Sequence, residues 1–148
     1  MQAIIFIGLQ GAGKSTFFKE KFFNTHIRIN MDMLKTRHRE DLLLAACLEM
    51  KQPFVIDKTN ATPKDRERFI QAAKANRFQV VAYYFVPDLK LSLERNAART
   101  GKERVPDGGL YATYKKLKPP LKEEGFDLLY TVRQDAAGNF LVEEVESI

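Results

Sequence analysis

The first residues of this sequence that can do chemistry form a glycine-rich stretch, GLQGAGKST, from Gly8 to Thr16. It fits the pattern G-x-x-x-x-G-K-[ST] without a mismatch. Glycines let the backbone curl so that several N–H groups point at one anion, and a following helix adds its positive end. Lys14 offers a charge to the β- and γ-phosphates of a nucleotide, and Ser15 offers a hydroxyl to Mg²⁺. The expected nucleotide-binding residues are Gly8, Gln10, Gly11, Ala12, Gly13, Lys14, Ser15 and Thr16.

A glycine-rich turn can also simply join a strand to a helix, so the setting of the motif matters. The apolar run AIIFI at residues 3–7 is typical of a buried strand, and residues 14–23 are expected to be helical. A strand before the glycines and a helix after them is the setting that the phosphate-binding motif requires. The expected ligands are therefore ATP, or another purine triphosphate, together with Mg²⁺.

Asp32 follows the short predicted strand HIRIN at residues 26–30. Ligands of parallel α/β sheets bind at the carboxyl ends of the strands, which would place this carboxylate beside the phosphate loop. There it can accept the proton of an attacking hydroxyl as a catalytic base. A helix-capping aspartate has the same local sequence, so the stretch alone leaves both roles open.

The stretch DKTN ends the third predicted strand, residues 54–56, and places Asp57 in the corresponding position. Asp57 can hold Mg²⁺ through a water molecule or steady an acceptor. Thr59 and Asn60 are polar candidates for acceptor contacts. The alternative is a simple turn, which Asp, Thr and Asn all favour.

Arg95 and Arg99 are four residues apart and are predicted to share one helix face. A basic, glycine-containing stretch follows, with Lys102 among its residues. Arginines on a mobile segment can close over a transferring phosphoryl group and neutralise its charge. A solvated basic helix end is the alternative. Beside a phosphate loop we prefer a catalytic lid over about residues 95–109.

Strand-like and helix-like segments alternate along the chain, which predicts an α/β fold. The expected sheet is mostly parallel, with about five strands and a C-terminal β-hairpin. The expected strands are 3–7, 26–30, 54–56, 79–86, 126–133 and 140–145. The expected helices are 14–23, 31–50 with a break near 36–39, 63–76, 88–98 and 110–117.

Composition and charge restrict the class of protein. The chain has 148 residues, 45% hydrophobic and 29% charged, which predicts one domain over residues 1–148. Its net charge of +5 favours polyanionic partners without deciding the matter. The one cysteine, Cys47, agrees with a reducing cytoplasm. No signal peptide and no membrane-spanning segment are evident, so we expect a cytoplasmic protein; the oligomeric state stays open.

Four stretches, GLQGAGKS, INMD, DKTN and RNAARTGKERVP, resemble in order and spacing the kinase domain of polynucleotide 5′-hydroxyl kinases. The resemblance runs from Gly8 to about Pro120 and implies a three-layer phosphate-loop kinase fold. It also implies that Asp32 is the general base, that Lys14 and Ser15 are the phosphate-loop lysine and serine, and that Arg95 and Arg99 are lid arginines. Where the family often has an arginine that grips the acceptor phosphate, this chain has Lys35.

Three functions are compatible with these residues. The first is ATP-dependent phosphorylation of a nucleic-acid 5′-hydroxyl. The second is a kinase for a small hydroxyl compound such as a sugar, nucleoside or antibiotic. The third is a nucleotide-binding regulatory module with weak hydrolysis. Asp32 and the predicted lid favour a kinase, since a sensor needs no base, and the basic charge favours a nucleic acid as the acceptor.

Overall fold

The computed structural model describes residues 1–101 and 104–148. Within these ranges it contains a six-stranded sheet with the order β2-β3-β1-β4-β5-β6. The first five strands of this order are parallel, and β6 pairs antiparallel with β5. The strands are β1 (Gln2–Ile7), β2 (Ile27–Ile29), β3 (Phe54–Ile56), β4 (Gln79–Phe85), β5 (Leu128–Gln134) and β6 (Phe140–Val145). The mostly parallel sheet with a C-terminal hairpin is therefore confirmed.

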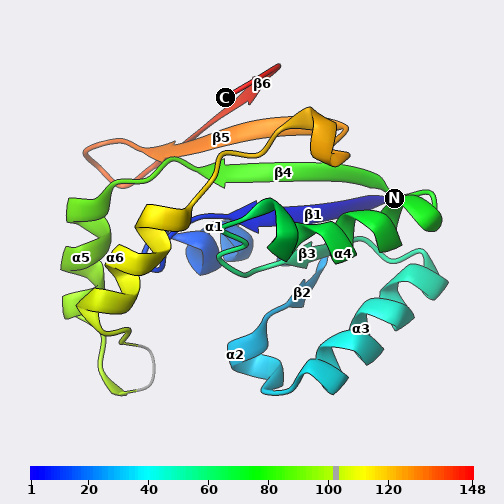
Figure 1. Cartoon of the computed structure of the whole chain (residues 1–148), viewed down its shortest axis with the longest axis horizontal. Helices are drawn as coiled ribbons and strands as arrows, with labels where there is room; N and C mark the ends of the chain where they lie inside the picture. Colours follow the sequence, from blue (N-terminus) through cyan, green and yellow to red (C-terminus); the bar gives the residue numbers. More distant parts are fainter. Residues whose placement is uncertain (102–103) are drawn as a thin grey trace.

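Helices lie on both faces of the sheet and beyond its carboxyl end. Figure 1 shows α5 and α6 at the left, past the point where the arrows of β1 and β4 end. The helices are α1 (Lys14–Lys21), α2 (Met31–Leu34), α3 (Arg37–Met50), α4 (Pro63–Ala75), α5 (Leu89–Ala97) and α6 (Asp107–Lys116). A short 3₁₀ helix follows at Lys122–Glu124. In the part of the chain that the structure describes, no helix is both long and apolar enough to cross a bilayer.

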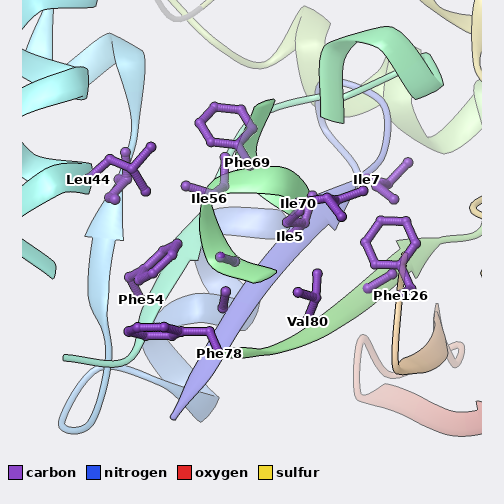
Figure 2. Close-up of a cluster of buried hydrophobic side chains, with 14 of the residues drawn as sticks. Ile5, Ile7, Leu44, Phe54, Ile56, Phe69, Ile70, Phe78, Val80 and Phe126 are labelled. Carbon is purple, nitrogen blue, oxygen red and sulfur yellow. The ribbon is translucent and has the colours of Figure 1, made fainter. Parts of the chain in front are cut away.

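Alternate side chains of β1 enter two different cores, because successive residues of a strand point to opposite faces. Ile5 and Ile7 pack with the buried faces of α3 and α4. Figure 2 shows this core, where Leu44 and Phe69 approach the sheet from those two helices. Both faces of a parallel sheet are covered, which explains the continuous apolar sequence of β1.

The second core is aromatic and lies between the sheet and α1. Phe6 of β1 packs against Phe17 of α1 at 5.8 Å and against Phe85 of β4 at 5.2 Å between ring centroids. Phe140, the first residue of β6, adds an edge contact to Phe17 at 5.0 Å. The rings therefore fix α1, and with it the loop that precedes α1, against the sheet.

Several helix boundaries differ by one to three residues from the sequence predictions, such as the end of α1 at Lys21 instead of residue 23, and two of the differences have a clear structural cause. The predicted break in the second helical segment falls at Lys35, where the backbone is left-handed (φ 74°), and Thr36 then caps α3 by accepting a hydrogen bond from the Arg39 N–H. Helix α6 begins at Asp107 rather than at Leu110. The glycines at 108 and 109 suggested a loop, but burial of Leu110 and Thr113 stabilises the helix there.

Candidate functional site

The glycine-rich loop connects β1 to α1, and α1 begins at Lys14. Gly13 caps this helix with a left-handed backbone (φ 92°), a conformation that favours glycine. Gly8 lies so close to β4 that an added Cβ would be 2.8 Å from the Cβ of Phe85. The N–H of Gly8 also donates to the carbonyl of Thr59 at 3.0 Å. The loop is thus held by its glycines and by the segment that follows β3.

The ammonium of Lys14 is turned toward this loop. Its Nζ donates to the carbonyls of Leu9 at 2.7 Å and Gly8 at 3.0 Å. Burial lowers the pKa of Lys14 to about 8, an effect that Arg99 reinforces and the carboxylates of Asp57 and Asp32 oppose. Lys14 therefore still carries its charge at neutral pH, in a largely desolvated position.

Ten of the predicted site residues line one cavity of about 170 Å³ in front of the loop. They come from separate parts of the chain, namely the loop itself, α1, α2, the segment after β3, and the segment after α5. The predicted residues of this group with side chains suited to chemistry are Lys14, Ser15, Asp32, Asp57, Thr59 and Arg99. Gln10, Gly11, Gly13 and Thr16 also line the cavity, whereas Gly8, Ala12, Lys35, Asn60 and Arg95 do not.

Asp32 lies in the first turn of α2 and does not cap that helix. The cap is Asn30, whose side-chain oxygen accepts a hydrogen bond from the Met33 N–H at 3.0 Å. The amide group of Asn30 also donates to the Asp57 carbonyl at 2.9 Å, which joins α2 to the end of β3. The Asp32 side chain is exposed at the cavity.

Asp57 is buried at the end of β3 and contacts both Ser15 and Arg28. The Ser15 hydroxyl donates to Asp57 Oδ2 at 3.4 Å, and Arg28 Nε donates to the same oxygen at 2.8 Å. A second Arg28 nitrogen donates to the Ser15 hydroxyl at 2.9 Å. Arg28 comes from β2, and its side chain is 28% exposed.

Ser15 and Asp57 fit a magnesium ion in the chemistry of their oxygens. Mg²⁺ in nucleotide sites is held by one or two protein oxygens together with substrate phosphates. Over the described ranges of the chain, no group of three or more His, Cys, Asp and Glu side chains can hold a metal by itself. A hydroxyl and a carboxylate that share a hydrogen bond beside a phosphate loop match the arrangement in which nucleotide phosphates complete the shell.

Asn60 does not reach the cavity, in contrast to its predicted acceptor role. It is buried, has a left-handed backbone (φ 46°), and donates through its amide group to the Phe6 carbonyl at 2.8 Å. Asn60 therefore fixes the turn after β3 to β1. Thr59 remains at the cavity, and Lys35 is exposed at the end of α2, outside the cavity lining.

Arg95 and Arg99 do not share a helix face, contrary to the prediction. Helix α5 ends at Ala97, so Arg99 lies beyond it and lines the cavity with Lys14. Arg95 donates to the Gly11 carbonyl at 3.0 Å and also bonds to Gln134. The predicted lid includes residues 102–103, and Lys102 thus lies outside the described residues.

Arg95 instead lines a second, larger cavity of about 440 Å³. Its walls come from the phosphate loop, the ends of β4 and β5, and the start of α5. Representative residues are Gly11, Phe85, Pro87, Leu91, Val132 and Gln134. Gly11 lines both cavities, so the two lie on either side of the loop.

Sequence reasoning missed three residues of the site. The sequence places Arg28 and Asn30 only within a short predicted strand, because their partner Asp57 is distant along the chain. Lys58 was overlooked inside DKTN, although it lines the smaller cavity. Its ammonium pairs at 3.2 Å with Glu40, whose side chain is fully buried. Burial and the nearby Arg37 lower the pKa of Lys58.

The fold and the loop define a phosphate-loop protein with a kinase-like arrangement of strands and helices. The family model described as an AAA domain matches residues 4–120. The chain therefore belongs to that AAA domain family, and this match includes the phosphate loop, Asp32, Asp57 and Arg99.

Individual relatives are more distant. The chain is 23% identical over 129 residues to a bifunctional polynucleotide phosphatase/kinase of Schizosaccharomyces pombe. The match covers 84% of this chain and 32% of that protein, so the chain spans about a third of the relative's length.

Two solved structures show the same fold. A gluconokinase from Sinorhizobium meliloti superposes with a TM-score of 0.60 at 19% identity, covering 89% of this chain and 82% of that one. Kti12 of Chaetomium thermophilum, in complex with ADP-AlF3, superposes with a TM-score of 0.67 at 17% identity and covers 92% of each chain. At these identities the likeness establishes the fold, which is that of the phosphate-loop kinases.

Proposed function

We propose that this protein transfers the γ-phosphate of ATP to the 5′-hydroxyl of a polynucleotide. The observation that carries the proposal is the convergence of Lys14, Asp32 and Arg99 on one cavity beside Ser15. A lysine for the nucleotide phosphates, a carboxylate for the hydroxyl proton and an arginine for the transferring group are what phosphoryl transfer requires. This set favours transfer over nucleotide sensing, which needs no base.

The proposed roles follow from the chemistry of each group. Asp32 accepts the proton of the acceptor hydroxyl. The hydroxyl oxygen forms a bond to the γ-phosphorus of ATP as the bond between that phosphorus and the β–γ bridging oxygen breaks. Lys14 and Arg99 neutralise the charge on the transferring group and on the leaving diphosphate. Ser15, and Asp57 through water, would hold Mg²⁺, which supplies further charge neutralisation. The products are ADP and a 5′-phosphorylated end.

The larger cavity is our candidate for the purine ring. It shares Gly11 with the cavity in front of the loop, so a nucleotide whose phosphates lie on the loop can extend its base there. Apolar residues such as Phe85, Leu91 and Val132 offer surface for a flat ring, as small-molecule sites usually do. Arg95 would then contact the nucleotide rather than the acceptor.

Three observations support a polynucleotide acceptor. The curated relative is a polynucleotide phosphatase/kinase by name, and this chain matches 32% of it. The net charge is +5. Lys58 lines the cavity, and Lys35 is exposed at the C-cap of α2, the helix that carries Asp32. A small hydroxyl compound is the second candidate, which the small volume of the cavity, about 170 Å³, favours.

The test is transfer of labelled γ-phosphate to a single-stranded oligonucleotide with a 5′-hydroxyl. The same oligonucleotide with a 5′-phosphate is the matched control, and a panel of sugars, gluconate and nucleosides runs in parallel. We expect label on the 5′-hydroxyl oligonucleotide only. If only a small alcohol becomes labelled, the protein is a kinase whose acceptor is that compound and not a polynucleotide. No transfer to any acceptor, with nucleotide bound, would favour a regulatory module.

Salt dependence tests the acceptor independently. Each phosphate that the protein neutralises on a single strand contributes about −0.7 to the slope of log affinity against log salt. Two or three contacts, from Lys35 and its basic neighbours Arg37 and Arg39, give a slope of about −1.4 to −2. Affinity for a neutral sugar would show almost no slope. A flat salt response for the oligonucleotide contradicts these contacts.

A further inference from the structure

Arg28 occupies an unexpected position for a site that binds a divalent cation. Its guanidinium donates to Asp57 Oδ2 at 2.8 Å and to the Ser15 hydroxyl at 2.9 Å. These two side chains are the ones to which the proposed function assigns Mg²⁺. A resident protein cation therefore lies against both candidate metal ligands.

Two cations cannot use these oxygens equally well at the same time. Asp57 Oδ2 already accepts hydrogen bonds from Arg28 and from Ser15, at 2.8 Å and 3.4 Å. A divalent ion at Ser15 would also lie within a few ångströms of the guanidinium charge, where like charges repel strongly in a partly buried site. The Asp57 side chain is 2% exposed and needs a positive partner. Arg28 supplies that positive charge when no metal ion is bound.

We propose that Arg28 is a built-in counter-cation that competes with the divalent metal for Ser15 and Asp57. This inference rests on the proposed function, because it assumes a metal–nucleotide complex at the phosphate loop. Binding of that complex requires the guanidinium to leave the two oxygens. Arg28 therefore sets the concentration of Mg²⁺ at which the site loads its nucleotide.

The surroundings of Arg28 allow this displacement. Its strand, β2, is an edge strand of the sheet, and the side chain is 28% exposed. Within the described part of the chain, its side-chain hydrogen bonds go only to Asp57 and Ser15. Rotation of the side chain toward solvent breaks these two bonds without disturbing the core.

Arg28→Gln is the main test, because glutamine keeps a hydrogen-bond donor but removes the charge. The measurement is binding of a fluorescent ADP analogue as Mg²⁺ is titrated from an EDTA-treated start. We expect the Mg²⁺-dependent increase in analogue binding to reach half of its maximum at an Mg²⁺ concentration about tenfold lower in the variant than in wild type. This factor corresponds to the loss of one charge-assisted contact. Arg28→Lys keeps a charge and should stay near the wild-type midpoint. Arg77→Gln, at an exposed arginine after α4, is the matched control.

The outcomes separate this inference from the proposed function. An unchanged or higher Mg²⁺ midpoint in Arg28→Gln overturns the competition while leaving nucleotide binding intact. No binding of the analogue by wild type or variant, with or without Mg²⁺, overturns the proposed function and this inference with it.

Thermal unfolding without nucleotide gives a second readout. Mg²⁺ alone should raise the melting temperature of Arg28→Gln more than that of wild type, because the unpaired Asp57 then gains a cation. A variant that is less stable but responds to Mg²⁺ as wild type does would make Arg28 a structural residue only, contrary to the proposal.

Discussion

The Lys14 ammonium donates a hydrogen bond to the carbonyl of Leu9 at 2.7 Å, within the loop that directly precedes α1. A second bond reaches the Gly8 carbonyl at 3.0 Å. These carbonyls stabilise a charge that burial disfavours, since the pKa of Lys14 is lowered to about 8. An incoming phosphate offers the ammonium a full negative charge in place of two dipoles, so nucleotide binding and protonation of Lys14 are coupled.

We expect ATP affinity to fall as the pH rises from about 7.5 to 9.5. Lys14 loses its proton around its pKa of about 8, and a neutral amine does not attract phosphate. Bound triphosphate raises the pKa of Lys14, so binding at alkaline pH should take up a proton. Calorimetry in two buffers of different ionisation enthalpy measures that uptake. Lys14→Arg stays charged and should show none; continued uptake in this variant would assign the proton to another group.

Substitutions of Arg95 and Arg99 should have different kinetic effects, because the two side chains line different cavities. Arg99→Ala removes a charge beside Lys14 and should lower transfer by about 10²-fold at saturating ATP, with a small change in nucleotide affinity. Arg95→Ala releases Gly11 and Gln134 and should mainly weaken nucleotide binding, by about tenfold. The measurements are single-turnover transfer and nucleotide dissociation constants. Equal changes in both quantities for both variants would contradict the assignment to two cavities.

The part of the site that the sequence predicted is the part encoded locally. The run from Ala3 to Ser15 carries its own strand, turn and helix signals, and the structure has a strand, loop and helix there. Arg95 and Arg99 were paired by their spacing, which assumed a helix through both. Helix α5 ends at Ala97, two residues before Arg99, so helical periodicity does not extend to the second arginine, which lines the other cavity.

Residues with distant partners could not be assigned from sequence. Asn60 has the composition of an exposed turn, yet its amide reaches a carbonyl of β1, 54 positions earlier in the chain. Arg28 was one polar residue in a short strand, and nothing near it indicates that Asp57 is its partner. The sheet order was also hidden, because β1 lies between β3 and β4 rather than beside β2.

Arg66 is predicted to be a major contributor to stability. It is fully buried and donates to the Asn60 carbonyl at 2.8 Å and to Glu124 at 3.0 Å, with further bonds to the Ala61 and Lys118 carbonyls. Arg66→Met leaves these acceptors without partners and should lower the free energy of unfolding by about 3–5 kcal/mol. Urea denaturation measures the loss.

Two variants control the Arg66 experiment. Lys64→Met, at an exposed site on the same helix, should change the free energy of unfolding by less than about 0.5 kcal/mol. The double substitution Arg66→Met with Glu124→Met should recover part of the loss, because no carboxylate is then left unpaired. A loss in Arg66→Met no larger than in Lys64→Met would mean that the buried bonds add little to stability.

Asp32→Asn tests the proposed base, and the structure indicates that this substitution removes the carboxylate without disturbing helix α2. Asp32 does not cap α2, a role that belongs to Asn30, so the variant should keep its fold and its nucleotide affinity. Asparagine cannot accept a proton at neutral pH, and transfer should fall by about 10²-fold or more. Single-turnover transfer at saturating ATP is the measurement. Glu20→Gln, at an exposed position of α1, is the control for loss of a carboxylate.

Assays below about pH 7.5 avoid the titration of Lys14. There, transfer by Asp32→Asn should still rise with pH, because the acceptor proton must go to solvent. Full activity in Asp32→Asn, with normal nucleotide affinity, would remove Asp32 from the chemistry and require another acceptor for that proton.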